Sequence, residues 1–259
     1  MALIEAAAPR TWQDLEASVA RILRECGYDV EVGKHIKLAR GDVNVDVWAD
    51  EHSSPPSIMI VECKHWASAV TKNVVHGFRT VVGDSGANLG LIVSSGGFQE
   101  GAIAAAAYSN VRLLTWEQFE QMFAIRWFRS FMSSTLGEET DALHEYMEPI
   151  NARVFRKADA WPEDRRQQFI ALRQQYQGLM AMNFAFHPVM LERDLAPLAS
   201  RLPTLPLRHS AEAPDGKKLA DLVPDDVLDA MALRPLMDAL VEHSRRATAE
   251  FDDVFGERA

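Results

Sequence analysis

Two stretches decide the fold: Gly41-Asp42-Val43-Asn44-Val45-Asp46-Val47-Trp48 and Ile58-Met59-Ile60-Val61-Glu62-Cys63-Lys64. In the first, apolar and polar residues alternate, so its three valines are expected on one face of a strand, with Asn44, Asp46 and Trp48 on the other. The second is an apolar run long enough for a buried central strand. Alternation places Glu62 and Lys64 on one face of it, and the Cys63 thiol on the other face as inert core. The sequence therefore predicts charged groups at the ends of two strands.

The residues around these strands predict an α/β or α+β domain built on one sheet over residues 1–130. Thr11 can cap a helix over about residues 12–26, and Gly27 follows its last turn. Further elements are expected as helices at 71–84 and 99–108, strands at 89–94 and 111–114, and a helix that opens at Trp116. Strand signals stop near residue 131, so residues 131–259 are expected to be all-α.

Composition limits the class of protein. The chain has 259 residues with 47% hydrophobic and 25% charged residues, which is typical of a soluble globular protein. No apolar stretch is long enough to span a bilayer, and the N-terminus MALIEAAAPR lacks the features of a signal peptide. A cytoplasmic protein without a membrane partner is therefore expected. Two cysteines exclude a disulfide framework and a four-cysteine zinc site.

The formal net charge of -10 is unevenly distributed. Residues 1–130 carry 12 basic and 15 acidic residues, whereas residues 131–259 carry 15 and 22. An acidic balance argues against a protein whose whole surface binds nucleic acid. Because most of the excess lies in the helical part, that part is expected to form a homo-oligomer or to bind a partner protein.

Asp46, Glu62 and Lys64 would bring two carboxylates and an ammonium group together. Carboxylates and the backbone carbonyl of Cys63 are oxygen donors that suit a hard divalent cation, with Mg2+ as the natural candidate and Mn2+ as a substitute. Such a cation can polarise a phosphodiester and lower the pKa of a bound water, while Lys64 orients the water or neutralises charge. The triplet alone is a weak pattern, and a salt bridge of Glu62 at a strand end is the alternative.

Five motifs in order make the pattern more specific: Trp12-Gln13-Asp14-Leu15-Glu16, Cys26-Gly27-Tyr28, Gly41 to Asp46, Val61-Glu62-Cys63-Lys64-His65-Trp66, and Ser94 to Ala102. Together they resemble the Mrr-like restriction endonuclease domain, a branch of the PD-(D/E)xK nuclease superfamily, over about residues 10–125. The resemblance implies a metal-dependent phosphodiesterase that acts on DNA, with a PD-(D/E)xK-type mixed sheet flanked by helices.

The resemblance also assigns roles to individual residues. Asp46 and Glu62 match the metal-binding acids of the family, and Lys64 matches its catalytic lysine. Glu16 matches an acid that many members carry on the first helix, although a solvated helix edge is an equal alternative from the residues alone. Gln99 falls in the motif that follows the third strand. The chain departs from the family by having glutamate before Cys63, where many members of this branch have glutamine.

The sequence thus predicts a Mg2+-dependent DNA endonuclease, with a restriction or antiphage defence role as the leading expectation. His65 and Trp66 are candidates for contact with nucleic acid, with a packing role as the alternative. A DNA repair or junction-resolving nuclease would use the same residues. A non-cleaving DNA-binding or assembly subunit of a defence complex is the alternative outside the enzyme class.

Overall fold

The computed structural model describes residues 3–148, 152–192, 202–209 and 222–256. The chain divides into two compact units. Ala7–Trp127 forms the first, which we call the sheet unit, and Met1–Ala6 with Phe128–Ala259 forms the second, the helical unit. This division lies between Trp127 and Phe128, close to the predicted boundary at residue 130, and it assigns the first residues of the chain to the helical unit.

The sheet unit contains a five-stranded mixed sheet in the order β1-β2-β3-β4-β5. Its strands are β1 (Asp29–Leu38), β2 (Gly41–Glu51), β3 (Ser57–Lys64), β4 (Leu89–Ser94) and β5 (Val111–Thr115). Its helices are α1 (Trp12–Glu25), α2 (Lys72–Ser85), α3 (Glu100–Ala106) and α4 (Trp116–Trp127). The first three strands pair antiparallel, whereas β3, β4 and β5 are parallel. The predicted α/β fold, with helices flanking a mixed sheet, is confirmed.

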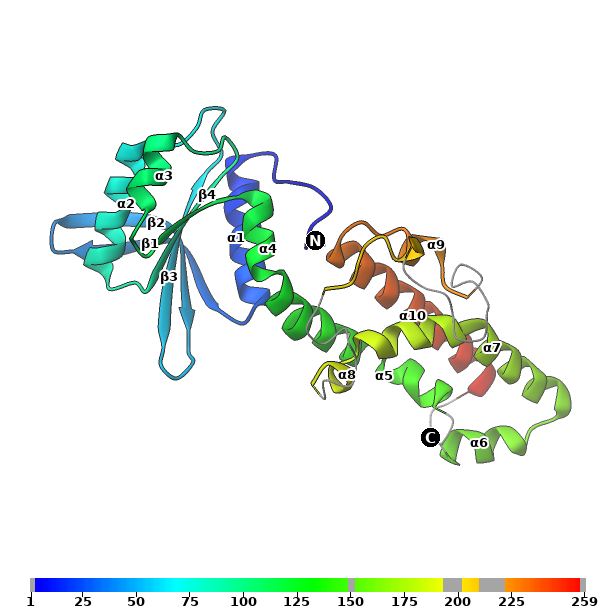
Figure 1. Ribbon diagram of the computed structural model, residues 1–259. Coiled ribbons are helices and arrows are strands. Elements are labelled where there is room, and N and C mark those ends of the chain that lie inside the picture. The colour runs from blue at the N-terminus through cyan, green and yellow to red at the C-terminus, as the bar shows by residue number, and fades with distance from the viewer. Residues whose placement is uncertain (1–2, 149–151, 193–201, 210–221, 257–259) are drawn as a thin grey trace. The chain divides into compact units, whose positions relative to one another are not determined.

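Helices cover both faces of this sheet (Figure 1). On one face, α2 and α3 pack against a core that includes Phe78, Ile60 and Ile92. On the other face, α1 and α4 cover residues such as Val61, which is fully buried. Gly90 lies where α2 crosses β4, and a Cβ atom there would come within 2.5 Å of a Val82 methyl group. Glycine therefore permits the close approach of this helix to the sheet.

β2 departs from the predicted alternation next to Asp46. Val45 packs in the same core cluster as Trp48 and Ile60, so the prediction that the three valines of this strand share the face opposite Trp48 is wrong. The pairing of β1 with β2 skips Gly33 and Asp46, and Gly33 has a left-handed φ of 65°. The register is the same on both sides of these two residues, so the irregularity is a local break in the strand pairing and not an inserted residue.

The helical unit consists of helices in the part of it that the structure describes, apart from an isolated bridge between Leu3 and Ala232. The helices are α5 (Ser133–Met147), α6 (Ala152–Asp159), α7 (Glu163–Phe186), α8 (Pro188–Glu192), α9 (Asp225–Leu228) and α10 (Leu233–Phe255), with a π-helical turn η1 (Phe128–Met132) and a 3-10 turn η2 (Leu207–His209). This agrees with the predicted all-α region. None of the helices described in either unit is both long and apolar enough to span a bilayer.

Aromatic packing and an ion pair hold the helical unit together. The Tyr146 ring of α5 stacks on Phe251 of α10 with a centroid distance of 5.0 Å, and Phe169 of α7 packs edge-on against Phe251. The N-terminal segment joins α10 through an ion pair of 2.8 Å between Glu5 and Arg234, both 14% exposed. Leu3 also accepts a backbone hydrogen bond in its bridge to this helix start.

Candidate active site

The candidate site lies where β2 and β3 separate. Their backbone pairing ends at Val47 and Val61, one residue before Asp46 and Glu62. Beyond that point the Asp46 side chain joins the two strands in place of backbone pairing, because its Oδ2 accepts a hydrogen bond of 2.7 Å from the Cys63 backbone N–H. The bond holds the acid of β2 against the end of β3, where the Glu-Cys-Lys triplet lies.

Lys64 and Glu62 form an ion pair within the site. The Lys64 ammonium donates to Glu62 Oε1, and their side chains are only 17% and 22% exposed. The strand-end salt bridge that the sequence left open is therefore present, and it is made inside the predicted catalytic triplet. The same ammonium lies 5.3 Å from the centroid of the Trp66 ring, so this tryptophan is part of the lysine's surroundings.

Negative charge accumulates at the site. Burial raises the pKa of Glu62, the neighbouring Asp46 raises it further, and Lys64 partly offsets these effects. Burial and then Asp46 likewise raise the pKa of Glu16 on α1. Glu16 is half-buried, so the structure places it near the other acids rather than on a solvated helix edge. The Asp46 carboxylate thus disfavours the ionised form of both glutamates, an effect that a bound cation would relieve.

A pocket of about 290 Å³ opens at this position. Its lining residues come from α1, β2 and the end of β3: Trp12, Glu16, Asp46, Cys63, Lys64, His65 and Trp66. The prediction that Cys63 belongs to a core away from the site is wrong, because the residue is only half-buried and lines the pocket. Burial and the surrounding carboxylates raise the pKa of its thiol well above the ordinary range, so the thiol stays protonated.

The loop after β4 supports the end of β3. The Ser95 N–H donates to the carbonyl of Lys64 at 3.1 Å, and its hydroxyl donates to the carbonyl of Trp66 at 3.2 Å. Gly96 fits so closely that a Cβ atom would lie 2.5 Å from the Trp66 carbonyl oxygen. Gln99 is exposed at the N-cap of α3 and is not among the residues that line the pocket. A catalytic role for its side chain therefore stays a prediction.

The oxygen atoms at the site are the type of ligand that a hard divalent cation prefers. Among the residues that the structure describes, no three His, Cys, Asp or Glu side chains are arranged to hold a metal ion. The fit consequently rests on the Asp46 and Glu62 carboxylates with the Cys63 carbonyl, and water would complete the coordination. Such a set, with few protein ligands and several waters, is typical of magnesium sites.

Comparison with known proteins links the sheet unit to one family. Residues 9–123, which make up less than half of the chain, match the family Mrr_cat, described as restriction endonuclease. The matched segment contains Glu16, Asp46, Glu62, Lys64 and Gln99. None of the curated proteins that were compared matches the chain significantly.

Three solved structures are similar to parts of the chain. AF1548, a protein of unknown function, is 14% identical over 62% of this chain and 95% of its own, with a TM-score of 0.37. A repair endonuclease from Pyrococcus abyssi is 18% identical over 44% of this chain and 50% of its own, with a TM-score of 0.31. The MspJI restriction endonuclease, in complex with a 27-mer oligonucleotide, is 21% identical over 45% of this chain and 28% of its own, with a TM-score of 0.29.

Sequence reasoning missed one pocket residue of the sheet unit, Trp12. It is 59% exposed at the first position of α1 and lines the same pocket as Glu16. Residues four apart lie on the same face of a helix, so the spacing of Trp12 from Glu16 carried the signal. His65, which the sequence proposed only as a possible contact, also lines the pocket, and its ring nitrogen lies 3.3 Å from the Pro9 carbonyl.

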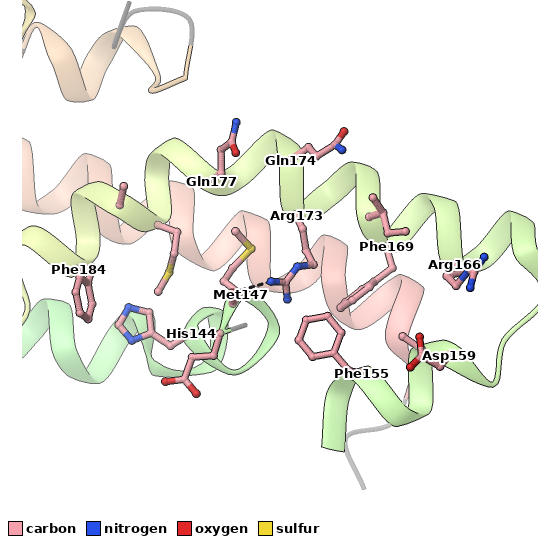
Figure 2. A pocket seen from close by; sticks show the side chains of 15 residues that line it. His144, Met147, Phe155, Asp159, Arg166, Phe169, Arg173, Gln174, Gln177 and Phe184 are labelled. Atoms are coloured by element: carbon pink, nitrogen blue, oxygen red, sulfur yellow. Dashed lines mark hydrogen bonds between the residues drawn. The ribbon is translucent and has the colours of Figure 1, made fainter. Parts of the chain in front are cut away.

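A larger cavity of about 840 Å³ lies in the helical unit (Figure 2). Its lining comes from α5, α6 and α7 and is mostly apolar. Figure 2 shows Arg173 of α7 among these residues, where it donates to the carbonyl of Met147 at 2.9 Å and lies 4.7 Å from the Phe155 ring. Arg173 thereby caps the end of α5. None of the predicted catalytic residues lines this cavity, so its size does not make it the candidate active site.

Proposed function

We propose that the chain is a Mg2+-dependent DNA endonuclease that hydrolyses phosphodiester bonds, with Mn2+ as an alternative cation. One observation carries the proposal: the Asp46 carboxylate accepts a hydrogen bond from the Cys63 N–H, between Glu62 and Lys64 at the end of β3. The match of this segment to a restriction endonuclease family supports the same conclusion.

Each residue has a role that follows from its surroundings. Asp46, Glu62 and the Cys63 carbonyl would hold the cation. When bound, the cation supplies Lewis acidity toward the phosphodiester and lowers the pKa of a coordinated water. Lys64 holds its ammonium between Glu62 and the Trp66 ring, where it donates a hydrogen bond to the attacking water or to a phosphate oxygen. Glu16 accepts a hydrogen bond from water at the pocket wall and so orients it.

The charge distribution agrees with a nuclease that is directed by its helical unit. Residues 1–130 are nearly balanced in charge, and two of their acids, Glu16 and Asp46, line the pocket. Residues 131–259 hold most of the negative excess, which makes them a poor surface for DNA and a suitable one for a partner protein or a second copy. We therefore assign DNA binding to the sheet unit, and assembly in a restriction or antiphage defence role to the helical unit.

Cleavage of supercoiled plasmid DNA with Mg2+, Mn2+ or EDTA tests the proposal. We expect nicking with either cation and none with EDTA. Asp46→Asn and Lys64→Ala should abolish it, whereas Glu117→Gln, which removes an exposed carboxylate of the same unit outside the pocket, should retain it. Equal nicking by Asp46→Asn and the parent protein would overturn the assignment. Preference for branched over linear duplexes would identify a repair or junction-resolving nuclease, and binding without cleavage would identify a non-cleaving subunit.

A further inference from the structure

We propose that Trp12 and Trp66 form a stacking platform for a nucleobase that is exposed from the double helix, so that the site acts on an unpaired strand. The proposal rests on the proposed nuclease function and names the form of its substrate.

The two residues stand out from the other tryptophans of the chain. Trp12 is 59% exposed and Trp66 is 41% exposed, and both line the pocket of about 290 Å³ that Glu16, Asp46 and Lys64 also line. The remaining four are buried or half-buried: Trp48, Trp116, Trp127 and Trp161. Exposing a large apolar ring to water is unfavourable, so a ligand that covers these two rings at one small pocket would be stabilised by burying them.

Both rings lie next to the groups that would carry out the reaction. Trp12 precedes Glu16 by four residues and therefore lies on the same face of α1. Trp66 follows Lys64 by two residues, and its ring centroid is 5.3 Å from the lysine ammonium. A base stacked on either ring would consequently bring its own phosphate to the acids and the lysine.

The backbone beneath each ring is held in place. Thr11 and Asp14 form a reciprocal capping box with two hydrogen bonds of 3.1 Å, which determines where α1 begins and thus where Trp12 lies. Ser95 and Gly96 hold the backbone of Trp66, the first by a hydrogen bond to its carbonyl and the second by close contact. Rigid supports reduce the entropy cost of binding, as a stacking platform requires.

The chemistry of the pocket favours an unpaired base over an intact duplex. In a duplex the faces of the bases are covered by their neighbours, so an aromatic side chain can stack only on a base that is flipped, frayed or single-stranded. Lys64 and His65 are the basic side chains among the lining residues, and Lys64 is paired with Glu62. With so few cations, stacking must supply affinity that phosphate contacts do not.

A binding experiment without catalysis tests the platform independently of the nuclease activity. A fluorescent single-stranded oligonucleotide and the matching duplex are titrated with the full-length protein in EDTA. Because removal of either ring removes its stacking on a base, Trp12→Ala and Trp66→Ala should each raise the Kd for the single strand roughly 5- to 150-fold. The Kd for the duplex should change less than about twofold. Trp66→Phe should retain most of the affinity, because phenylalanine also stacks.

Met122→Ala serves as the matched control, because it removes a 47% exposed apolar side chain from α4, outside the pocket. It should leave both Kd values unchanged. Tryptophan variants that weaken single strand and duplex equally, or neither, overturn the proposal, as does a Trp66→Phe variant that binds no better than Trp66→Ala. Circular dichroism and the midpoint of thermal unfolding establish that each variant is folded.

Cleavage assays separate failure of the platform from failure of the nuclease assignment. With Mg2+, a duplex that contains a short unpaired segment should be cut at that segment faster than a continuous duplex, and the tryptophan variants should abolish the difference. Equal cutting of both substrates by the parent protein contradicts the platform but leaves the nuclease assignment standing. Absence of cutting on every substrate contradicts the nuclease assignment, while the binding experiment still decides whether the platform exists.

Discussion

Replacement of Asp46 by asparagine or by alanine should separate the structural role of this residue from its chemical role. Asp46 accepts a hydrogen bond from the Cys63 N–H and also bears one of the charges of the site. Asparagine retains an acceptor oxygen in place of the carboxylate, whereas alanine leaves the half-buried N–H without its partner. Both replacements remove the repulsion that raises the pKa values of Glu16 and Glu62, so this effect cancels when the two variants are compared.

The expected difference follows from the hydrogen bond alone. A buried N–H that loses its partner costs about 1–3 kcal/mol, and the partial exposure of this site favours the lower part of that range. An amide is also a weaker acceptor than a carboxylate, so asparagine recovers only part of the bond. We therefore expect Asp46→Asn to be more stable than Asp46→Ala by about 1 kcal/mol, which is roughly 4 °C in the unfolding midpoint for a unit of this size.

Urea unfolding followed by tryptophan fluorescence measures the stability difference, because the sheet unit contains buried tryptophans. Plasmid nicking with Mg2+ measures the chemical effect, and both variants should be inactive. Equal stability of the two variants would show that the bond to Cys63 does not stabilise the end of β3. Activity in Asp46→Asn would show that the charge is not needed for the reaction, which would refute the assignment of Asp46 as a metal ligand.

Three further predictions concern other parts of the molecule. Gly96→Ala should displace the Trp66 carbonyl oxygen, because the new Cβ atom would lie 2.5 Å from it. We expect the free energy of unfolding to fall by about 1–3 kcal/mol in urea titrations, and the rate of plasmid cleavage to fall as well. Arg173→Ala removes the donor that caps α5, so the helical unit should lose about 2 kcal/mol by thermal unfolding. Burial and then His187 lower the pKa of His144, so the folded protein favours its neutral form. The stability that this histidine contributes above about pH 6.5 should therefore be lost as the pH falls. His144→Gln should make the unfolding midpoint depend less on pH, as measurements at a series of pH values would show.

Local patterns predicted most elements of the sheet unit correctly. The strand at 89–94 was predicted with the observed bounds of β4, and α1 was located within a residue because Thr11 and Gly27 mark its ends. No specific prediction covered β1. Gly33 and Lys34 interrupt its apolar pattern. Because the residues of this strand are exposed or half-buried, its sequence alternates only weakly between apolar and polar residues.

The triplet of Asp46, Glu62 and Lys64 was recognised from residue types and from a family resemblance. The geometry of the triplet could not be predicted from the sequence. Strict alternation assumes an undistorted strand. The irregularity opposite Gly33 and the end of pairing after Val47 both depend on neighbouring strands, which a local pattern does not contain. For the same reason Cys63 was placed in the core, although it borders the pocket together with Asp46 and Lys64.

The attachment of Glu5 to Arg234 has a consequence for how the protein folds as it is synthesised. The helical unit is built from segments that precede and follow the sheet unit in the sequence. The segment that contains Leu3 is translated before the sheet unit, whereas its bridge partner Ala232 is translated after it. The sheet unit can therefore complete its core first, and the helical unit must wait for the segment that begins α10. The order of synthesis therefore introduces a delay between formation of the candidate active site and formation of the unit that we propose directs it.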